Sequence, residues 1–198
     1  MFYRGPLYRA LNPIFAHEPL SGHGAELYGG RFNPKGMPAL YSSLTVMTAL
    51  REANQAGSFQ PTTLVSYYAE IDGVFDSRDR AALQREGMDD TALADTSWRD
   101  QMRATGEART QGFARRLVAG GYTALLVRSF APGVTESDLN LVLWKWGAAA
   151  PARLTLIDNE GRLSVRKEVR GHAVKTHCKA KPDRKTAQAD SAVVANPI

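Results

Sequence analysis

The stretch Thr63–Ile71, with the sequence TLVSYYAEI, decides what kind of fold this chain adopts. Alternation along it places Val65, Tyr67, Ala69 and Ile71 on one face. An apolar period of two predicts a β-strand with one buried side. We therefore take this stretch as a strand of a sheet.

Further strands are expected to be short and scattered along the chain. They are predicted at Ala39–Tyr41, Thr123–Val127, Leu139–Trp144 and Arg153–Ile157. The charged region Asp72–Gly106 shows no clear period, so we expect short helices and a surface loop there.

One helix is predicted over Leu44–Asn54. The Ser43 hydroxyl can accept a backbone N–H at its start, which makes this serine the expected N-cap. Val46, Met47 and Leu50 then fall on one face of that helix.

A second helix is predicted over Arg109–Ala119, where Phe113 and Leu117 stand four residues apart. It is expected to end at Gly120-Gly121, a usual C-terminal signal. Strands and helices are mixed without regular βαβ alternation, so we expect an α+β fold with a small mixed sheet and flanking helices.

The charge of the chain indicates a domain boundary. Among 198 residues the net charge is +5, and Val165–Ile198 alone holds eight Lys and Arg against three Asp and Glu. We expect a globular domain over residues 1–164 and a basic, poorly ordered tail over residues 165–198, with at most a short helix over Val165–Lys175. Direct nucleic-acid binding is not expected of the electrically balanced domain.

Several protein classes are disfavoured by composition. No apolar run is long enough for a membrane span, and the N-terminus lacks the layout of a signal peptide, so we expect a cytoplasmic protein. The single cysteine, Cys178, excludes an internal disulfide. No metal site is expected, because the four histidines do not pair with cysteine at metal-ligand spacing; they are His17, His23, His172 and His177.

Chemistry is suggested by the glycine-rich loop Gly29–Gly36, with the sequence GGRFNPKG. Arg31 in this loop is followed by Tyr41 and then by Glu52. A cation, an aromatic ring and a carboxylate suit a dinucleotide such as NAD⁺, which offers a pyrophosphate, a nicotinamide ring and a ribose that gains positive charge as nicotinamide leaves. The alternative is a run of tight turns with a surface arginine.

The motifs in this order resemble the RES domain, and the resemblance covers roughly Tyr3 to Ser164. They are Tyr8-Arg9, Gly29–Pro34, Pro38–Ser43, Ala49–Glu52 and Val127–Ser129. The arginine, glutamate and serine that name the domain map onto Arg31, Glu52 and Ser129. Arg128 stands where the family pattern has proline.

The resemblance implies a toxin of a toxin–antitoxin pair, similar to ParT-like ADP-ribosyltransferase toxins. It implies a fold like that of ADP-ribosyltransferase toxins, NAD⁺ as substrate, no metal, and a helix-turn-helix antitoxin that blocks the active site. ADP-ribose is expected to pass to a target protein, with water or phosphate as alternative acceptors. A non-catalytic module that binds RNA or protein through the basic tail is the alternative of another class.

The resemblance also implies roles for single residues. Arg31 and Glu52 are the expected catalytic residues: Arg31 grips a phosphate of NAD⁺, and Glu52 stabilises the charged ribose. Their alternatives are an ion pair that pins the loop and a solvated helix glutamate. Tyr41 is expected to stack on nicotinamide or to lie in the core.

Three further residues are candidate NAD⁺ contacts. Ser129 at a strand end is expected to bind ribose or the nicotinamide amide, or to end the strand. Asn140 is expected to orient the ligand or to satisfy the backbone. Arg9 is expected to be a second phosphate contact or a surface charge.

Overall fold

The computed structural model describes residues 1–54 and 60–163. The predicted tail, with its helix over Val165–Lys175, lies outside the described residues. The domain boundary near Ser164 therefore stays a prediction. None of the helices in the described ranges has the length and apolar character of a membrane span.

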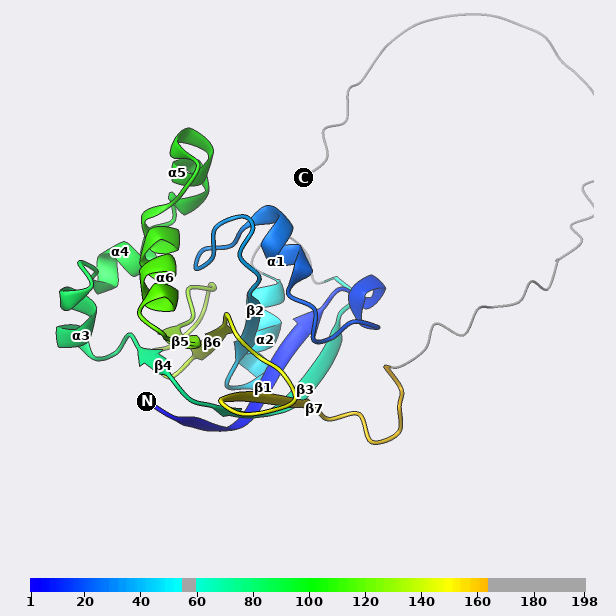
Figure 1. The fold of residues 1–198 in the computed structure, drawn as a ribbon. Coiled ribbons are helices and arrows are strands. Elements are labelled where there is room, and N and C mark those ends of the chain that lie inside the picture. The colour runs from blue at the N-terminus through cyan, green and yellow to red at the C-terminus, as the bar shows by residue number, and fades with distance from the viewer. Residues whose placement is uncertain (55–59, 164–198) are drawn as a thin grey trace, which may run out of the picture. The chain divides into compact units, whose positions relative to one another are not determined.

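The described residues form a seven-stranded sheet with helices against it (Figure 1), which confirms the expected α+β fold. The strands are β1 (Tyr3–Leu11), β2 (Leu40–Ser43), β3 (Thr63–Ile71), β4 (Val74–Asp76), β5 (Ala124–Arg128), β6 (Leu139–Leu143) and β7 (Ala152–Leu156). The helices are the 3₁₀ turn η1 (Pro13–Phe15), α1 (His23–Tyr28), α2 (Val46–Ala53), α3 (Arg80–Arg85), α4 (Asp90–Ala94), α5 (Trp98–Thr105) and α6 (Arg109–Ala119).

The sheet order is β4-β5-β6-β2-β1-β3-β7, in which β4 and β5 are parallel and the other neighbours antiparallel. Every strand expected from the sequence is present, with ends shifted by a residue or two. On β3 the predicted inner residues Val65, Tyr67, Ala69 and Ile71 are all buried. The period-two interpretation of this segment is therefore confirmed.

The sequence patterns missed strand β1, although it lies between β2 and β3. Gly5 and Pro6 lower the strand signal of this segment. Pro6 pairs with Tyr68 of β3, whereas β1 pairs with β2 at Tyr8, opposite Ser43, the last residue of β2. Pro6 thus lies past the end of β2, where its missing N–H is not needed by a second neighbour.

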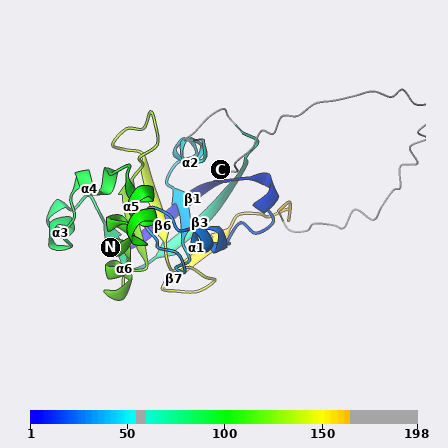
Figure 2. The same cartoon turned by 90° about the horizontal axis from the view of Figure 1, so that it is seen from above.

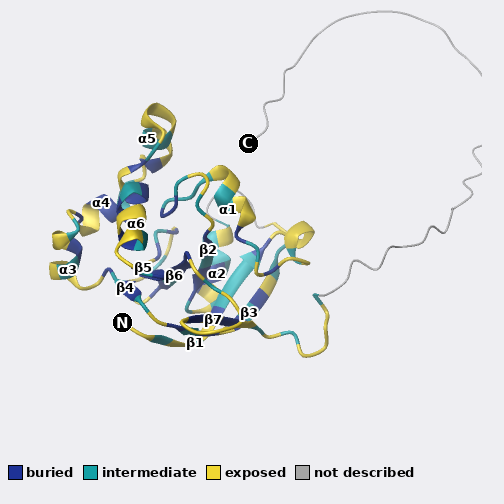
Figure 3. Cartoon of the chain, in the orientation of Figure 1, coloured by how far each residue is buried: buried dark blue, intermediate teal, exposed yellow. Residues whose placement is uncertain are grey.

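Buried residues lie along the strands of the sheet (Figure 3) and form two apolar clusters. Alternation along β5 and β6 assigns the two clusters to opposite faces of the sheet. The buried members of the first are all strand residues and come from all seven strands of the described chain, so the sheet curves around them. The second joins strands β4, β5 and β6 to helices α3, α4 and α6, through residues such as Phe75, Leu125, Leu83, Leu93 and Phe113. Both views of the ribbon show these helices grouped beside β4, β5 and β6, away from α2 (Figure 2).

Helix α6 spans the predicted range, Arg109–Ala119, with Phe113 and Leu117 buried and Gly120 as its C-cap. The predicted N-cap of α2 was wrong. Ser43 belongs to β2, and the N-cap is Thr45, whose hydroxyl accepts the Thr48 N–H at 3.1 Å.

The inner face of α2 is also not the one predicted. Met47 is 56% exposed, whereas Thr48 and Ala49 are buried. The apolar residues of this short helix do not mark its inner side, because α2 faces a polar part of the sheet rather than an apolar cluster. This polar contact brings Glu52 to the site described below.

Candidate functional site

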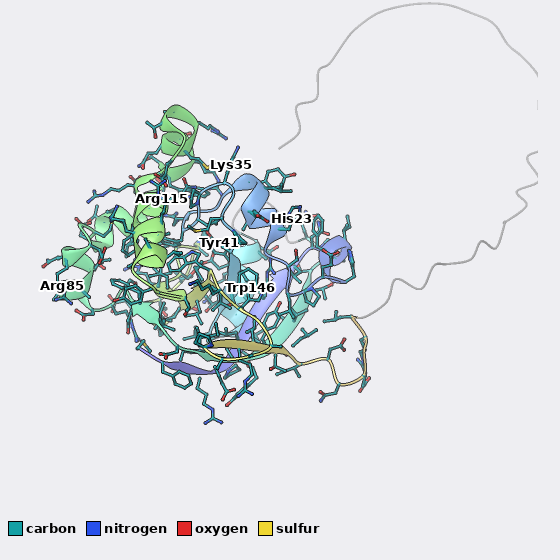
Figure 4. All side chains as sticks on the ribbon, viewed as in Figure 1. His23, Lys35, Tyr41, Arg85, Arg115 and Trp146 are labelled. Carbon is teal, nitrogen blue, oxygen red and sulfur yellow. The ribbon has the colours of Figure 1, made fainter. Side chains whose placement is uncertain are left out.

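The candidate site lies on the sheet face that carries Tyr8, Ser43 and Asn140. Ser43 is paired with Tyr8 on one side and with Asn140 on the other, and directly opposed residues point to the same face. Tyr41 is two residues before Ser43 and shares that face. Tyr41 lies near the middle of the ribbon (Figure 4).

Glu52, near the end of α2, lies over this face and accepts hydrogen bonds from the side chains of two described residues. The Ser129 hydroxyl and the Asn140 side-chain N–H each donate to Glu52 Oε1 at 2.5 Å. Ser43 Oγ in turn donates to Asn140 Oδ1 at 2.6 Å, which fixes the amide. Residues from β2, from the end of β5 and from β6 thus orient a single carboxylate.

Ser129 is buried just beyond the end of β5, and its position does not depend on a proline before it. Its backbone N–H donates to the Asp138 carbonyl at 2.7 Å, and Ala131 N–H donates to its Oγ at 3.2 Å. Arg128 pairs with Leu139 and is exposed. Replacement of the family proline by Arg128 therefore leaves Ser129 in contact with Glu52.

A second carboxylate, that of Asp138, ties α2 to the loop between β5 and β6. Asp138 Oδ1 accepts the Thr48 hydroxyl at 2.5 Å and lies 3.1 Å from Arg51 Nη1. Its Oδ2 accepts the Thr135 N–H and hydroxyl. The Thr48 bond, followed by the Thr135 N–H, lowers the pKa of Asp138 to about 2. This cluster aligns the two segments that bring Glu52 and Ser129 together.

The glycine loop packs against Tyr41 through its hydroxyl. Tyr41 donates to Asn33 Oδ1 at 2.7 Å and accepts the Phe32 N–H at 3.0 Å. An added Cβ on Gly30 would lie 2.6 Å from Asn33 Oδ1 and closer still to the Tyr41 hydroxyl. Glycine is thus required at position 30 by a close approach. Burial raises the pKa of Tyr41 well above its usual range, so this phenol stays a donor.

The same loop is fastened to the rest of the domain at two more points. Gln111 of α6 donates to the carbonyls of Gly30 and Asn33, and Trp144 Nε1 donates to the Phe32 carbonyl at 2.8 Å. A loop held in this way presents its next side chain, Arg31, in a defined direction.

Arg31 is half-buried, and carbonyls rather than a carboxylate hold it. Its Nη1 donates to the carbonyls of Leu93 and Asp95, both at 2.9 Å, and its Cζ lies 4.7 Å from the centre of the Phe130 ring. Burial lowers the pKa of Arg31, and the charge of Glu52 partly opposes this. The ion pair considered as its alternative role is not formed with any described residue.

Two hollows meet at Tyr41, Glu52 and Asn140. The first has a volume of about 340 Å³ and lies between α2, β1 and β2. The second has a volume of about 250 Å³ and is lined by Arg31, Arg99 and aromatic side chains, among them Phe32, Trp98 and Phe130. Together they fall in the size range of about 300–1,000 Å³ that is usual for ligand sites.

Arg9 is the one predicted site residue whose side chain the structure does not bring to this group. It lines the first hollow, yet its Nη1 donates to the carbonyls of Pro19 and Ser21. Alternation along β1 turns it away from the face of Tyr8. We therefore leave Arg9 out of the proposed ligand contacts.

Sequence reasoning did not identify several residues of the site. Asn33 stood within the quoted glycine loop, and its position there was a usable signal. Trp98 and Arg99 begin helix α5, in a charged region where the sequence showed no clear period, and Asp138 lies between β5 and β6, so no local pattern marked them.

The arrangement can bind an anion at one end and stabilise positive charge at its centre. Arg31 supplies the cation, and the doubly anchored carboxylate of Glu52 supplies the negative charge. No group of three or more His, Cys, Asp or Glu in the described ranges is placed to hold a metal ion.

In comparisons with known proteins, the RES domain matches residues 6–166 of this chain. The comparison with curated proteins gave no match.

Proposed function

The chain belongs to the RES domain family, and from that premise and the geometry of the site we propose that it cleaves the nicotinamide–ribose bond of NAD⁺. The observation that carries the proposal is the carboxylate of Glu52, oriented by Ser129 and Asn140 at the junction of two hollows, one of them basic. A carboxylate in that position suits a reaction in which positive charge develops at the middle of an elongated anionic substrate.

In the proposed reaction the bond between ribose C1′ and the nicotinamide nitrogen breaks, and its electron pair leaves with neutral nicotinamide. The ribose gains oxocarbenium character in the transition state, and Glu52 stabilises that charge more strongly than it stabilises the ground state. The lone pair of an acceptor then forms the new bond to C1′. The acceptor releases its proton to Glu52 or to water.

The two hollows support one orientation of the substrate. The phosphates lie in the second hollow, where Arg31 binds them by charge-assisted hydrogen bonds from the nitrogens that its carbonyl partners do not use. The nicotinamide lies toward the first hollow, against Tyr41. This orientation sets the scissile bond beside Glu52.

We propose that the acceptor is a side chain of a target protein, and that the chain is the toxin of a toxin–antitoxin pair neutralised by a helix-turn-helix antitoxin. These two points rest on family membership. Transfer to water or phosphate would use the same site and would deplete NAD⁺ instead.

The test is nicotinamide release from NAD⁺ by purified protein, alone and with cell extract, with label followed from the adenine side. Glu52→Gln keeps the shape of the side chain and removes its charge, so it should lower release by about a hundredfold or more. Glu160→Gln, at an exposed carboxylate paired with Arg162, is the matched control.

Label on a protein band supports ADP-ribosyl transfer, and label in small products alone indicates hydrolysis or phosphorolysis. Absence of nicotinamide release from folded protein under both conditions would overturn the proposed function. Full activity of Glu52→Gln would remove Glu52 from the mechanism.

A further inference from the structure

Two arginines face the second hollow from unrelated parts of the chain. Arg31 follows the Gly29-Gly30 turn, and Arg99 lies in the first turn of α5. Their guanidinium carbons lie 6.0 and 4.3 Å from the centre of the same Trp98 ring. The buried tryptophan therefore brings two positive charges to one wall of the hollow.

Like charges that face one hollow repel each other unless an anion lies between them. Burial is the largest cause of the lowered pKa of Arg31. The charge of Glu52, which lines the same hollow, opposes this lowering, and the charge of Arg99 adds to it. Cation–π contact with Trp98 offsets only part of this repulsion. Among the described residues, neither arginine forms an ion pair with a carboxylate. The pair is thus arranged for an anion that comes from outside the chain.

The two arginines differ in how firmly they are held. Arg31 is fixed by two carbonyls and the Phe130 ring. Arg99 is exposed and rests on Trp98 by a cation–π contact. One guanidinium is thus preformed, and the other can close onto a ligand. A diphosphate, with charged oxygens on two neighbouring phosphorus atoms, matches two guanidinium forks better than a single phosphate does.

We propose that Arg99 and Arg31 form a diphosphate-binding pair in the second hollow, with Arg99 as the arm that closes over the pyrophosphate. As a contact to NAD⁺ this proposal rests on the proposed function. It adds a binding residue from α5, outside the segments that hold Glu52. Loss of a contact made equally in the ground and transition states raises KM and leaves kcat nearly unchanged, so Arg99→Ala should raise the KM for NAD⁺.

The test is equilibrium titration of the folded full chain with ADP-ribose, inorganic pyrophosphate and adenosine. Arg99→Ala should weaken ADP-ribose and pyrophosphate binding by about tenfold to a hundredfold, as expected for loss of a charge-assisted hydrogen bond. Arg99→Lys should recover part of the affinity, since it keeps the charge without the planar fork. Arg103→Ala, one turn later on α5 and paired with Asp100, is the matched control and should bind like the unmodified chain.

Unchanged diphosphate binding by Arg99→Ala, or failure of the unmodified chain to bind either diphosphate, would overturn the proposal. An equal loss of adenosine binding would also overturn it, because it would assign Arg99 to base stacking. An Arg99→Ala variant that releases nicotinamide with an unchanged KM for NAD⁺ would refute this inference alone. Diphosphate binding that depends on Arg99, without any nicotinamide release, would support the pair and refute the proposed enzyme.

Discussion

The two donors that hold Glu52 are predicted to control the rate of nicotinamide release. Ser129 and Asn140 each contact Glu52 Oε1 at 2.5 Å. A hydrogen bond to a charged group contributes about 1.5–3 kcal/mol, and about 1.4 kcal/mol in the barrier corresponds to a tenfold change in rate. Ser129→Ala and Asn140→Ala should therefore each lower kcat by about tenfold to a hundredfold.

The double variant should lose less than the product of the two single losses. Both bonds end on the same oxygen, so removal of one donor already lets the carboxylate of Glu52 turn, and neighbouring effects of this kind are not additive. Steady-state kcat and KM for the four proteins measure this coupling.

Stability has to be followed in the same experiment. Ser129→Ala also removes the acceptor of the Ala131 N–H, which costs about 1–3 kcal/mol when a buried group is left unsatisfied. Thermal denaturation shows that each variant is folded at the assay temperature. Glu136→Gln, in the same loop but exposed, is the control and should keep both stability and kcat.

Two results would refute this reasoning. If folded single variants kept kcat within about twofold, the orientation of Glu52 would not limit the reaction. If KM alone rose, Ser129 and Asn140 would act as direct substrate contacts rather than as supports of the carboxylate.

Two further predictions concern the supports of the site. Because the Thr48 hydroxyl bond lowers the pKa of Asp138 to about 2 from 3.8, this carboxylate stabilises the fold above pH 4 and loses its effect as the pH falls through 2. Thermal denaturation should therefore find Asp138→Asn less stable than the unmodified chain at pH 7, with the difference in stability shrinking toward pH 2. A difference that stays constant with pH would argue against this stabilising role of the Asp138 carboxylate. Gly30→Ala should displace Tyr41 and abolish nicotinamide release. The control is Gly112→Ala, whose added Cβ meets atoms no nearer than 3.7 Å. It should keep activity and raise stability by about 0.5–1 kcal/mol.

Strong periodicity allowed the prediction of some elements from the sequence. Strand β3 alternates buried and less buried side chains, and α6 places Phe113 and Leu117 one turn apart before a glycine pair. In both segments the local pattern and the tertiary environment agree, because each has one face on an apolar cluster. Strand β1 and the cap of α2 were not predicted correctly, since Pro6 and Ser43 take their roles from neighbours in the sheet, which leaves Thr45 as the cap.

The residue types of the site were also available from the sequence. Arg31, Tyr41 and Glu52 stand in an order that suggested a dinucleotide, and the motifs around them resemble the RES domain. The contacts that these three residues make could not be predicted from the sequence. Tyr41 uses its hydroxyl to hold the glycine loop, and Arg31 binds carbonyls 62 and 64 residues away.

By itself, the sequence determined the mixture of strands and helices, the balanced charge of the domain and the family to which the chain belongs. Tertiary structure alone decided which side chains meet. Ser129 and Asn140 reach Glu52 across 77 and 88 residues, and Arg99 joins Arg31 through a tryptophan in a segment without periodicity. The physical reason is that such contacts depend on the order in which strands pair, and this order is set by burial over the whole domain rather than by any local repeat.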